Sequence, residues 1–254
     1  MLTFAKTEME YPERVDILGI GVDPVTMQEA VHRIKRFFEE GVPRMIVTAD
    51  ASGIVLAHSD RQLKDIYENA DLVTPDSYGV VWASKRTKDP IFERVTGVEL
   101  VEEICKICSV NGYSLFLLGS APGVAEKARI KIKEKYPTIN VVGTHHGYFS
   151  KEEEPEIVAE ISSLRPQGLI VAMGIPRQEI FIRDNMHLIG ASVNIGVGGS
   201  FDVLSGNVKR APVLIQKMRL EWLWRLIMNP RKWKKVLTLP KFVWMVLTSS
   251  KKKT

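Results

Sequence analysis

The chain has 254 residues, of which 45% are hydrophobic and 26% charged, a composition that excludes intrinsic disorder and allows one large core or two small ones. Its apolar runs, such as residues 242–247, are far shorter than the roughly 18 residues that span a bilayer, and its start lacks the apolar core of a signal peptide, so we expect a cytoplasmic protein. The charge is uneven, because residues 209–254 hold 13 Lys and Arg against one acid, Glu221, whereas the other residues hold 22 bases against 29 acids.

Short β-rich runs alternate with amphipathic helical stretches up to residue 205, a pattern typical of an α/β fold with a Rossmann-like, largely parallel sheet flanked by helices. The predicted strands are residues 16–22, 44–48, 72–74, 114–118, 140–143, 169–173 and 192–197. The predicted helices are residues 26–40, 52–69, 78–86, 97–110, 123–135, 151–163, 176–188 and 200–205. We therefore expect an α/β body over residues 1–208 and a separate basic helical appendage over residues 209–254.

Polar residues follow two of the predicted strands, at the sheet edge where ligands bind in this fold class. Thr48 and Asp50 come at the end of the strand at 44–48, and Asp76 lies in a turn between a strand and a helix. Asp76 has two interpretations, either a chemically active carboxylate or the N-cap of the helix that follows it.

Glycine-rich turns follow three other strands. Gly119 precedes the helix at 123–135, and Gly198 and Gly199 belong to a strand-to-helix turn that ends at Asp202. Backbone amides in such turns can cradle a phosphate or the uridine part of a nucleotide, although tight turns alone also explain each glycine. In the third turn Gly174 allows close backbone approach, and Gln178 can face a bound polar group.

Cysteine and histidine residues give no metal or redox signature. Cys105 and Cys108 form a CxxC, but their spacing inside the helix predicted at 97–110 places both on one apolar face, which favours a structural role. His145 and His146 are adjacent and would point to opposite faces of a strand, and no Asp-x-Asp occurs in the chain. The sequence therefore predicts no metal site and no cofactor.

The basic segment contains two predicted helical stretches, 213–228 and 231–247, and four of the five tryptophans. Lysines mixed with aromatic and aliphatic side chains are typical of helices that lie on an anionic membrane surface. The alternative is that the aromatic side chains pack on the body and the lysines are merely solvated. A basic segment also suits nucleic acid, so a second functional hypothesis is a nucleic-acid-binding protein with an α/β scaffold.

An ordered set of motifs resembles the TagA/WecG/CpsF family of bacterial glycosyltransferases over about residues 15–236. The set comprises LGIGV at 18–22, VTADA at 47–51, the segment 71–81 around Asp76, RVTGVEL at 94–100, LLGS at 117–120, GIPRQE at 174–179, GVGGSFD at 196–202, RAP at 210–212, LEWLWR at 220–225 and NPR at 229–231. Each motif is weak by itself, whereas the ordered set is specific.

The resemblance implies an inverting, metal-independent glycosyltransferase at the inner face of the cell membrane. The best-known members move N-acetylmannosamine from a UDP-sugar donor to the 4-hydroxyl of N-acetylglucosamine on undecaprenyl diphosphate, the committed step of wall teichoic acid synthesis, and relatives move other sugars. The partners so implied are a UDP-sugar, a polyprenyl-diphosphate-linked acceptor and an anionic membrane surface, with no nucleic acid.

The resemblance also implies residue roles. Asp76 would be the general base with Thr48 beside it, and Arg94 and Gln178 would bind donor or acceptor groups. Arg225 and Arg231 would fold over the pocket and neutralise the diphosphate, replacing a metal. The other substrate-binding candidates are Asp50, Asp202 and, from the glycine-rich turns, Gly119, Gly198 and Gly199.

The chain departs from the family pattern at Asp50, where Asn is frequent, and at Lys232, Lys234 and Lys235, where arginines are common. Asp50 is therefore expected to influence which sugar is accepted. A third hypothesis, an NAD-dependent oxidoreductase, is disfavoured because no G-x-G-x-x-G follows the first strand. The transferred sugar, the polymer and self-association into a homo-oligomer are left open.

Overall fold

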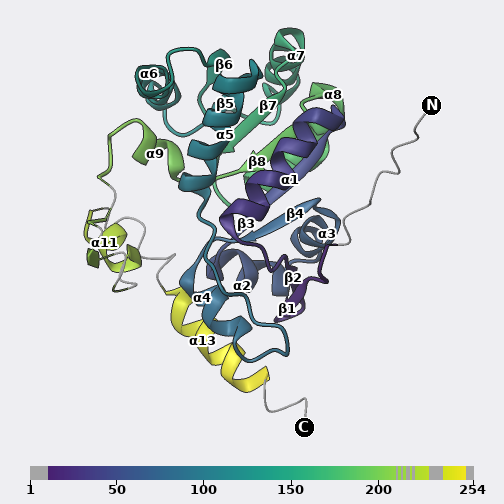
Figure 1. Cartoon of the computed structure of the whole chain (residues 1–254), viewed down its shortest axis with the longest axis vertical. Coiled ribbons are helices and arrows are strands. Elements are labelled where there is room, and N and C mark those ends of the chain that lie inside the picture. The colour runs from purple at the N-terminus through teal and green to yellow at the C-terminus, as the bar shows by residue number, and fades with distance from the viewer. Residues whose placement is uncertain are drawn as a thin grey trace, which may run out of the picture.

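The computed structural model describes residues 11–209, 211, 212, 214, 215, 218, 221–228 and 237–249, with the backbone alone at residues 225 and 228. Figure 1 shows a central sheet with helices on both faces and the last helix, α13 (Thr238–Ser249), beside α2 and α4. The predicted α/β class is confirmed.

Six parallel strands form the central sheet in the order β4-β3-β8-β7-β5-β6. They are β3 (Arg44–Ala49), β4 (Leu72–Pro75), β5 (Ser114–Gly119), β6 (Asn140–His145), β7 (Gly168–Ala172) and β8 (Val193–Gly196). Most of their residues are buried, as expected for a parallel sheet that helices cover on both faces. Because all six run in one direction, their carboxyl ends meet at one edge of the sheet.

The single strand predicted over residues 16–22 is wrong, because the chain turns back on itself in the middle of that range. β1 (Val15–Ile17) and β2 (Ile20–Val22) form an antiparallel hairpin. Leu18 and Gly19 have φ values of 58° and 82°, and the Gly19 amide donates to Asp16 Oδ1 at 2.6 Å. Leucine is uncommon at positive φ, so no residue pattern indicated this turn.

Helices on the two faces of the sheet bury two apolar clusters. One cluster takes side chains from α1 (Met27–Glu40), α5 (Gly97–Asn111), α6 (Val124–Lys135) and α9 (Ser200–Leu204). The other takes side chains from the hairpin and from α2 (Ala51–Ser59), α3 (Arg61–Asn69), α4 (Tyr78–Ser84), α7 (Glu154–Leu164) and α8 (Arg177–Ile189). Strand side chains alternate between the two, so Val47 belongs to the second cluster and Ile46 to the first.

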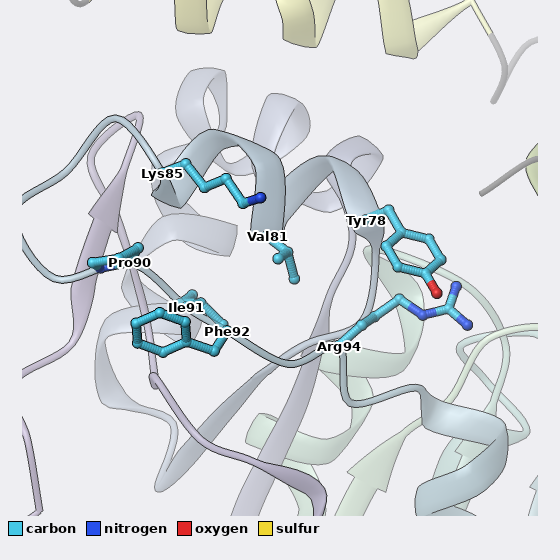
Figure 2. A pocket seen from close by; sticks show the side chains of 7 residues that line it. All are labelled: Tyr78, Val81, Lys85, Pro90, Ile91, Phe92 and Arg94. Atoms are coloured by element: carbon cyan, nitrogen blue, oxygen red, sulfur yellow. The ribbon is translucent and has the colours of Figure 1, made fainter. Parts of the chain in front are cut away.

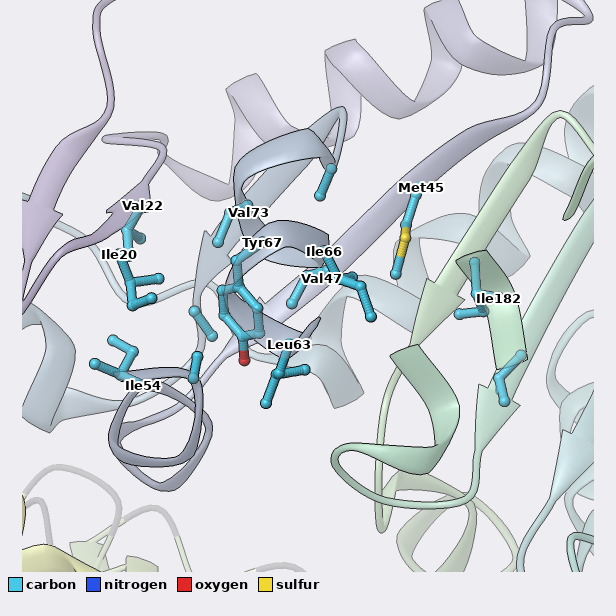
Figure 3. Packing of buried hydrophobic residues seen from close by; sticks show 14 of the residues in the cluster. Ile20, Val22, Met45, Val47, Ile54, Leu63, Ile66, Tyr67, Val73 and Ile182 are labelled. Atoms are coloured by element: carbon cyan, nitrogen blue, oxygen red, sulfur yellow. The ribbon is translucent and has the colours of Figure 1, made fainter. Parts of the chain in front are cut away.

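The single helix predicted over residues 52–69 is also wrong, because Asp60 ends one helix and begins another. Its amide donates to the Leu56 carbonyl, which closes α2, and its side chain accepts from the Leu63 amide at 3.1 Å, which caps α3. Aspartate is a strong N-cap, so the sequence held a signal for this break. The redirected α3 places Tyr67 in the core between the hairpin and α2 (Figure 3).

Cys105 and Cys108 are free thiols buried in α5. Burial raises the pKa of Cys105 to about 12 and raises the pKa of Cys108 as well. Both thiols therefore stay protonated and pack as small apolar side chains, as predicted.

The described part of the basic segment contains α11 (Glu221–Met228) and α13. Phe242 and Val246 of α13 are buried in the same cluster as α2 and α4, and Thr238 donates to Ser52 Oγ at 3.1 Å. α13 thus packs on the body, while the boundary at residue 209 stays a prediction and residues 231–236 lie outside the described residues. Within the part of the chain that is described, no helix is both long and apolar enough to cross a bilayer.

Candidate active site

Loops at the carboxyl edge of the sheet bring most of the predicted site residues to one place. Asp50 follows β3, Asp76 follows β4 and Gly198 follows β8, and these three strands are neighbours in the sheet. Gly119 ends β5, and Gln178 lies in the first turn of α8, after β7.

Asp76 is held between two segments that are far apart in the sequence. Its amide donates to the Ala49 carbonyl at 2.9 Å, and its Oδ1 accepts from the Gly97 amide at 2.8 Å. Gly97 is the first residue of the 15-residue helix α5, whose N-terminal partial positive charge stabilises an anion. Ser77 is the N-cap of α4, so the interpretation of Asp76 as that cap is wrong. Asp76 is half-buried, which leaves part of its side chain accessible.

Thr48 lies beside the same helix start. Its hydroxyl donates to the Gly196 carbonyl at 2.8 Å, and its methyl group faces Gly97. The side chain is buried, and the bond to Gly196 fixes the direction of its O–H group. The hydroxyl oxygen can still accept a hydrogen bond. The structure therefore links β3, β8 and α5 through Thr48, and a substrate contact by this residue remains a prediction.

Asp50 caps α2, since its Oδ1 accepts from the Gly53 amide at 2.8 Å. The Ala51 amide, in the same first turn, donates to Ser77 Oγ at 3.2 Å, and Ser77 also caps α4. Two helix starts are thereby fixed to each other next to Asp76.

Gln178 bridges two of the glycine-rich turns. Its Oε1 accepts from the Gly174 amide at 3.1 Å and from the Gly198 amide at 2.8 Å, and its Nε2 donates to Glu179 Oε1 at 2.7 Å. Gln178 and Glu179 are both fully buried. The sequence predicted that Gln178 binds substrate; the bridge between turns was missed because it depends on β7 and β8 being neighbours.

Gly119 is required by close packing of two backbones. It has a φ of 135°, and a Cβ there would collide with the backbone of Ala172 in β7. The Ser120 amide donates to the Ala172 carbonyl and the Gly147 amide to the Ser120 carbonyl, each at 2.8 Å. By contrast, a Cβ at Gly198 would meet open space, although its φ of 53° favours glycine.

Arg94 connects this edge to the C-terminal segment. Its Nη1 donates to Glu221 Oε2 of α11 at 2.9 Å, and the two side chains are 13% and 8% exposed. The Arg94 guanidinium also lies 4.3 Å above the ring of Tyr78. Sequence analysis noted Glu221 as the lone acid of its segment but did not predict Arg94 as its partner. A lone acid among cations was nevertheless a signal for a specific ion pair.

The structure describes only some of the remaining predicted site residues. Asp202 is half-buried in α9, and Gly199 is the N-cap of that helix. Arg225 lies in α11, but its side chain is outside the described residues, as is the whole of Arg231. The roles assigned to these arginines stay predictions.

Tyr67 is a buried residue beneath the site that the sequence did not reveal. Its hydroxyl lies under Gly53, where a Cβ would collide with it, and it has no hydrogen-bond partner among the described residues. Burial, and then the nearby charges of Glu179 and Asp50, raise the pKa of Tyr67 well above its ordinary value. Tyr67 is therefore a neutral phenol, and Figure 3 shows its ring among the buried hydrophobic side chains.

A cavity of about 390 Å³ lies between α4, which starts two residues after Asp76, and the segment at residues 90–94. Figure 2 shows it lined by Tyr78, Val81, Lys85, Pro90, Ile91, Phe92 and Arg94. Among the described residues, no three His, Cys, Asp or Glu side chains gather as they would around a metal ion.

Comparison with known proteins identifies the family. Residues 15–254 match the Glycosyl transferase WecG/TagA/CpsF family. The chain belongs to this family. The WecG/TagA/CpsF match covers the loops around Asp50, Asp76, Gln178 and Gly198, so the edge described above lies wholly within it.

Enzymes of Staphylococcus aureus are among the similar relatives. The N-acetylglucosaminyldiphosphoundecaprenol N-acetyl-beta-D-mannosaminyltransferase of strain MW2 is 34% identical over 241 residues, which cover 94% of each chain. The enzymes of that name from strains NCTC 8325 / PS 47 and COL show the same identity and coverage. As a WecG/TagA/CpsF member, the protein is a glycosyltransferase, which sets aside the hypotheses of a nucleic-acid-binding protein and an oxidoreductase.

Proposed function

We propose that the protein transfers N-acetylmannosamine from a UDP-sugar to the 4-hydroxyl of N-acetylglucosamine carried on undecaprenyl diphosphate. The names of the S. aureus relatives support the transferred sugar and the lipid-linked acceptor. The observation that carries the proposal is the half-buried Asp76 carboxylate, fixed by the Gly97 amide at the edge where ligands bind in this fold class. The product would enter wall teichoic acid or a related surface polymer.

In the proposed reaction Asp76 is the general base. The acceptor O4 attacks the anomeric carbon of the donor, the bond from that carbon to the diphosphate oxygen breaks, and UDP leaves with the bonding electron pair. The O4 proton moves to the Asp76 carboxylate. Attack opposite the leaving group inverts the anomeric configuration.

The other residues would bind and orient the substrates. Open space next to Gly198 suits close approach of a donor phosphate to the turn, whose position Gln178 fixes. Thr48 and Asp50 would contact the sugars beside Asp76. We propose that Arg94, Arg225 and Arg231 balance the charge of the leaving diphosphate.

We further propose that the enzyme works at the inner face of the cell membrane as a peripheral protein. Large apolar side chains are exposed on the described C-terminal elements, including Trp222 and Ile227 of α11 and Trp244 and Leu247 of α13. The surrounding segment carries a net charge of +12, which suits anionic lipid headgroups.

Incubation with a panel of UDP-sugars and a lipid-linked N-acetylglucosamine tests the proposal. We expect a product whose mass has increased by one N-acetylhexosamine, with the best rate for UDP-N-acetylmannosamine and with the β configuration by NMR if the donor is α-linked. Transfer only from another sugar nucleotide would contradict the donor assignment, and a product that retains the donor configuration would contradict direct attack by the acceptor.

A further inference from the structure

Two residues that line the cavity between α4 and residues 90–94 are close to the Asp76 turn in the chain: Tyr78 comes two residues after Asp76, and Arg94 comes three residues before Gly97. One wall is α4, which starts two residues after Asp76, and the other wall leads back to Gly97, whose amide binds the Asp76 carboxylate. The Val95 amide donates to the Pro75 carbonyl at 3.0 Å, which holds the two walls together at this end. The cavity is therefore a trough along α4, with one end near the turn that carries Asp76.

The outer end of the trough is also fixed. The Ile91 amide donates to Ser84 Oγ at 2.9 Å, and Thr87 Oγ1 donates to the Ser84 carbonyl at 2.7 Å. These bonds anchor the outer end of the second wall to the C-terminal turn of α4, and Ile91 itself is buried. The trough is thus built by hydrogen bonds at both ends.

The lining of the trough is apolar with a cationic edge. Val81, Pro90, Ile91 and Phe92 form the apolar part, and Phe92 is 89% exposed. Figure 2 shows the Lys85 side chain extending toward Val81 on the α4 side of the cavity. No ion pair joins Lys85 to any residue within the described ranges, so its ammonium is available to an anionic ligand.

We propose that this trough, which we call the acceptor trough, binds the diphosphate and the first isoprene units of the polyprenyl acceptor. This inference rests on the proposed function. When the acceptor sugar presents its 4-hydroxyl to Asp76, its diphosphate and polyprenyl chain must extend away from Asp76. In the trough, Lys85 would bind the diphosphate, and Phe92, Val81 and Pro90 would contact the chain.

The position of the trough also fits a lipid whose chain ends in a bilayer. Its wall α4 contacts α13, and α13 exposes Trp244 and Leu247. A chain held along α4 would therefore run close to a helix that we propose to lie on the membrane. The same geometry explains why a phenylalanine is left exposed next to a catalytic edge.

Kinetics with two soluble acceptors in lipid-free buffer test the proposal. Both carry N-acetylglucosamine on a diphosphate, one ending in a farnesyl chain and the other in a methyl group. We expect Phe92→Ala to raise KM for the farnesyl acceptor about 10-fold, the effect of losing part of a buried aromatic contact, and to leave KM for the methyl acceptor and for the donor unchanged. We expect Lys85→Ala to raise KM for both acceptors about 10-fold.

Two exposed residues on elements outside the trough serve as matched controls. Val110 is exposed at the end of α5, and Lys133 is exposed in the last turn of α6. Val110→Ala and Lys133→Ala should leave KM for both acceptors unchanged. Because Phe92 and Lys85 are exposed as well, all four variants should fold as the unaltered protein does.

The outcomes separate this inference from the proposed function. If the unaltered protein transfers sugar and Phe92→Ala does not discriminate between the two acceptors, the trough proposal is overturned while the proposed function stands. An effect of Phe92→Ala that appears only with vesicles would instead make Phe92 a bilayer contact. If no sugar is transferred to either acceptor, the proposed function fails. Labelling with a photoreactive farnesyl diphosphate then tests directly whether the trough binds an isoprenoid diphosphate. Label within residues 81–94 supports the trough proposal, and label elsewhere overturns it.

Discussion

Asp76 depends on residues that the sequence places far from it. The Gly97 amide and the Ala49 carbonyl fix its backbone and carboxylate, and both come from other elements. Asparagine at this position could still accept the hydrogen bond from Gly97 but could not accept a proton. The position therefore allows a test that separates chemistry from folding.

We predict that Asp76→Asn lowers kcat about 10²–10⁴-fold while the thermal unfolding temperature and donor KM stay close to those of the unaltered protein. Steady-state transfer assays and circular dichroism measure these quantities. Asp60→Asn is the matched control, because asparagine also caps a helix and Asp60 lies at the break between α2 and α3. Unreduced turnover by Asp76→Asn would rule out Asp76 as the base.

Gln178 presents a different case, because its side chain is buried and bonded within the protein. We predict that Gln178→Ala lowers the free energy of unfolding by about 2–4 kcal/mol, since the Gly174 and Gly198 amides both lose their acceptor. The unfolding temperature should fall by about 5–10 °C. Gln28→Ala, an exposed change in α1, should leave it unchanged. An unchanged unfolding temperature with a raised donor KM would mean that Gln178 acts through the substrate alone.

At the scale of elements, strong local patterns predicted most helices and strands correctly. Element boundaries that depend on a single turn were missed. Buried strands such as β5 and β7 were found within a residue or two because continuous apolar runs mark them. The hairpin at 15–22 was missed because its turn uses a leucine at positive φ. The break at Asp60 was missed because the residues on both sides of it form helices, so the two helices were predicted as one.

The candidate site was predictable as a set of strand ends, but its internal contacts were not. A strand end carrying Thr48 or Asp76 can be read from the sequence, because parallel strands share an edge. The pairing of Gln178 with Gly198, and of Arg94 with Glu221, depends on the order of strands and on where α11 packs. Neither is encoded in a local pattern, so both required the structure.

An ion pair between Arg94 and Glu221 joins the segment beside Asp76 to α11, and its strength can be measured. We predict a coupling free energy of about 1–3 kcal/mol from a double-mutant cycle with Arg94→Gln and Glu221→Gln, measured by denaturant unfolding, because both side chains are largely shielded from water. The control cycle uses Lys131 and Glu134 of α6, whose side chains are 55% and 57% exposed and should couple by less than about 0.5 kcal/mol. A coupling no larger than the control would show that the pair does not dock α11.

At the scale of the whole molecule, charge and packing divide the C-terminal segment between two tasks. An acidic body carries a segment of net charge +12, yet α13 buries Phe242 in the body core. One helix can therefore pack on the body with one face and contact a membrane with the other, so the two interpretations of the segment are compatible. Opposite faces of α13 can be tested separately.

We predict that two neighbouring aromatic residues of α13 behave differently when each is changed to alanine. Phe242 is 1% exposed, so Phe242→Ala should lower the free energy of unfolding by about 3–5 kcal/mol. Trp244 is 65% exposed, so Trp244→Ala should change that free energy by less than about 0.5 kcal/mol but weaken binding to anionic vesicles about 10-fold in cosedimentation. Added salt should weaken binding of the unaltered protein further, because the lysines act through screened charges. Vesicle binding that is identical in Trp244→Ala and the unaltered protein would remove α13 from the proposed membrane surface, since the exposed ring is its largest apolar group.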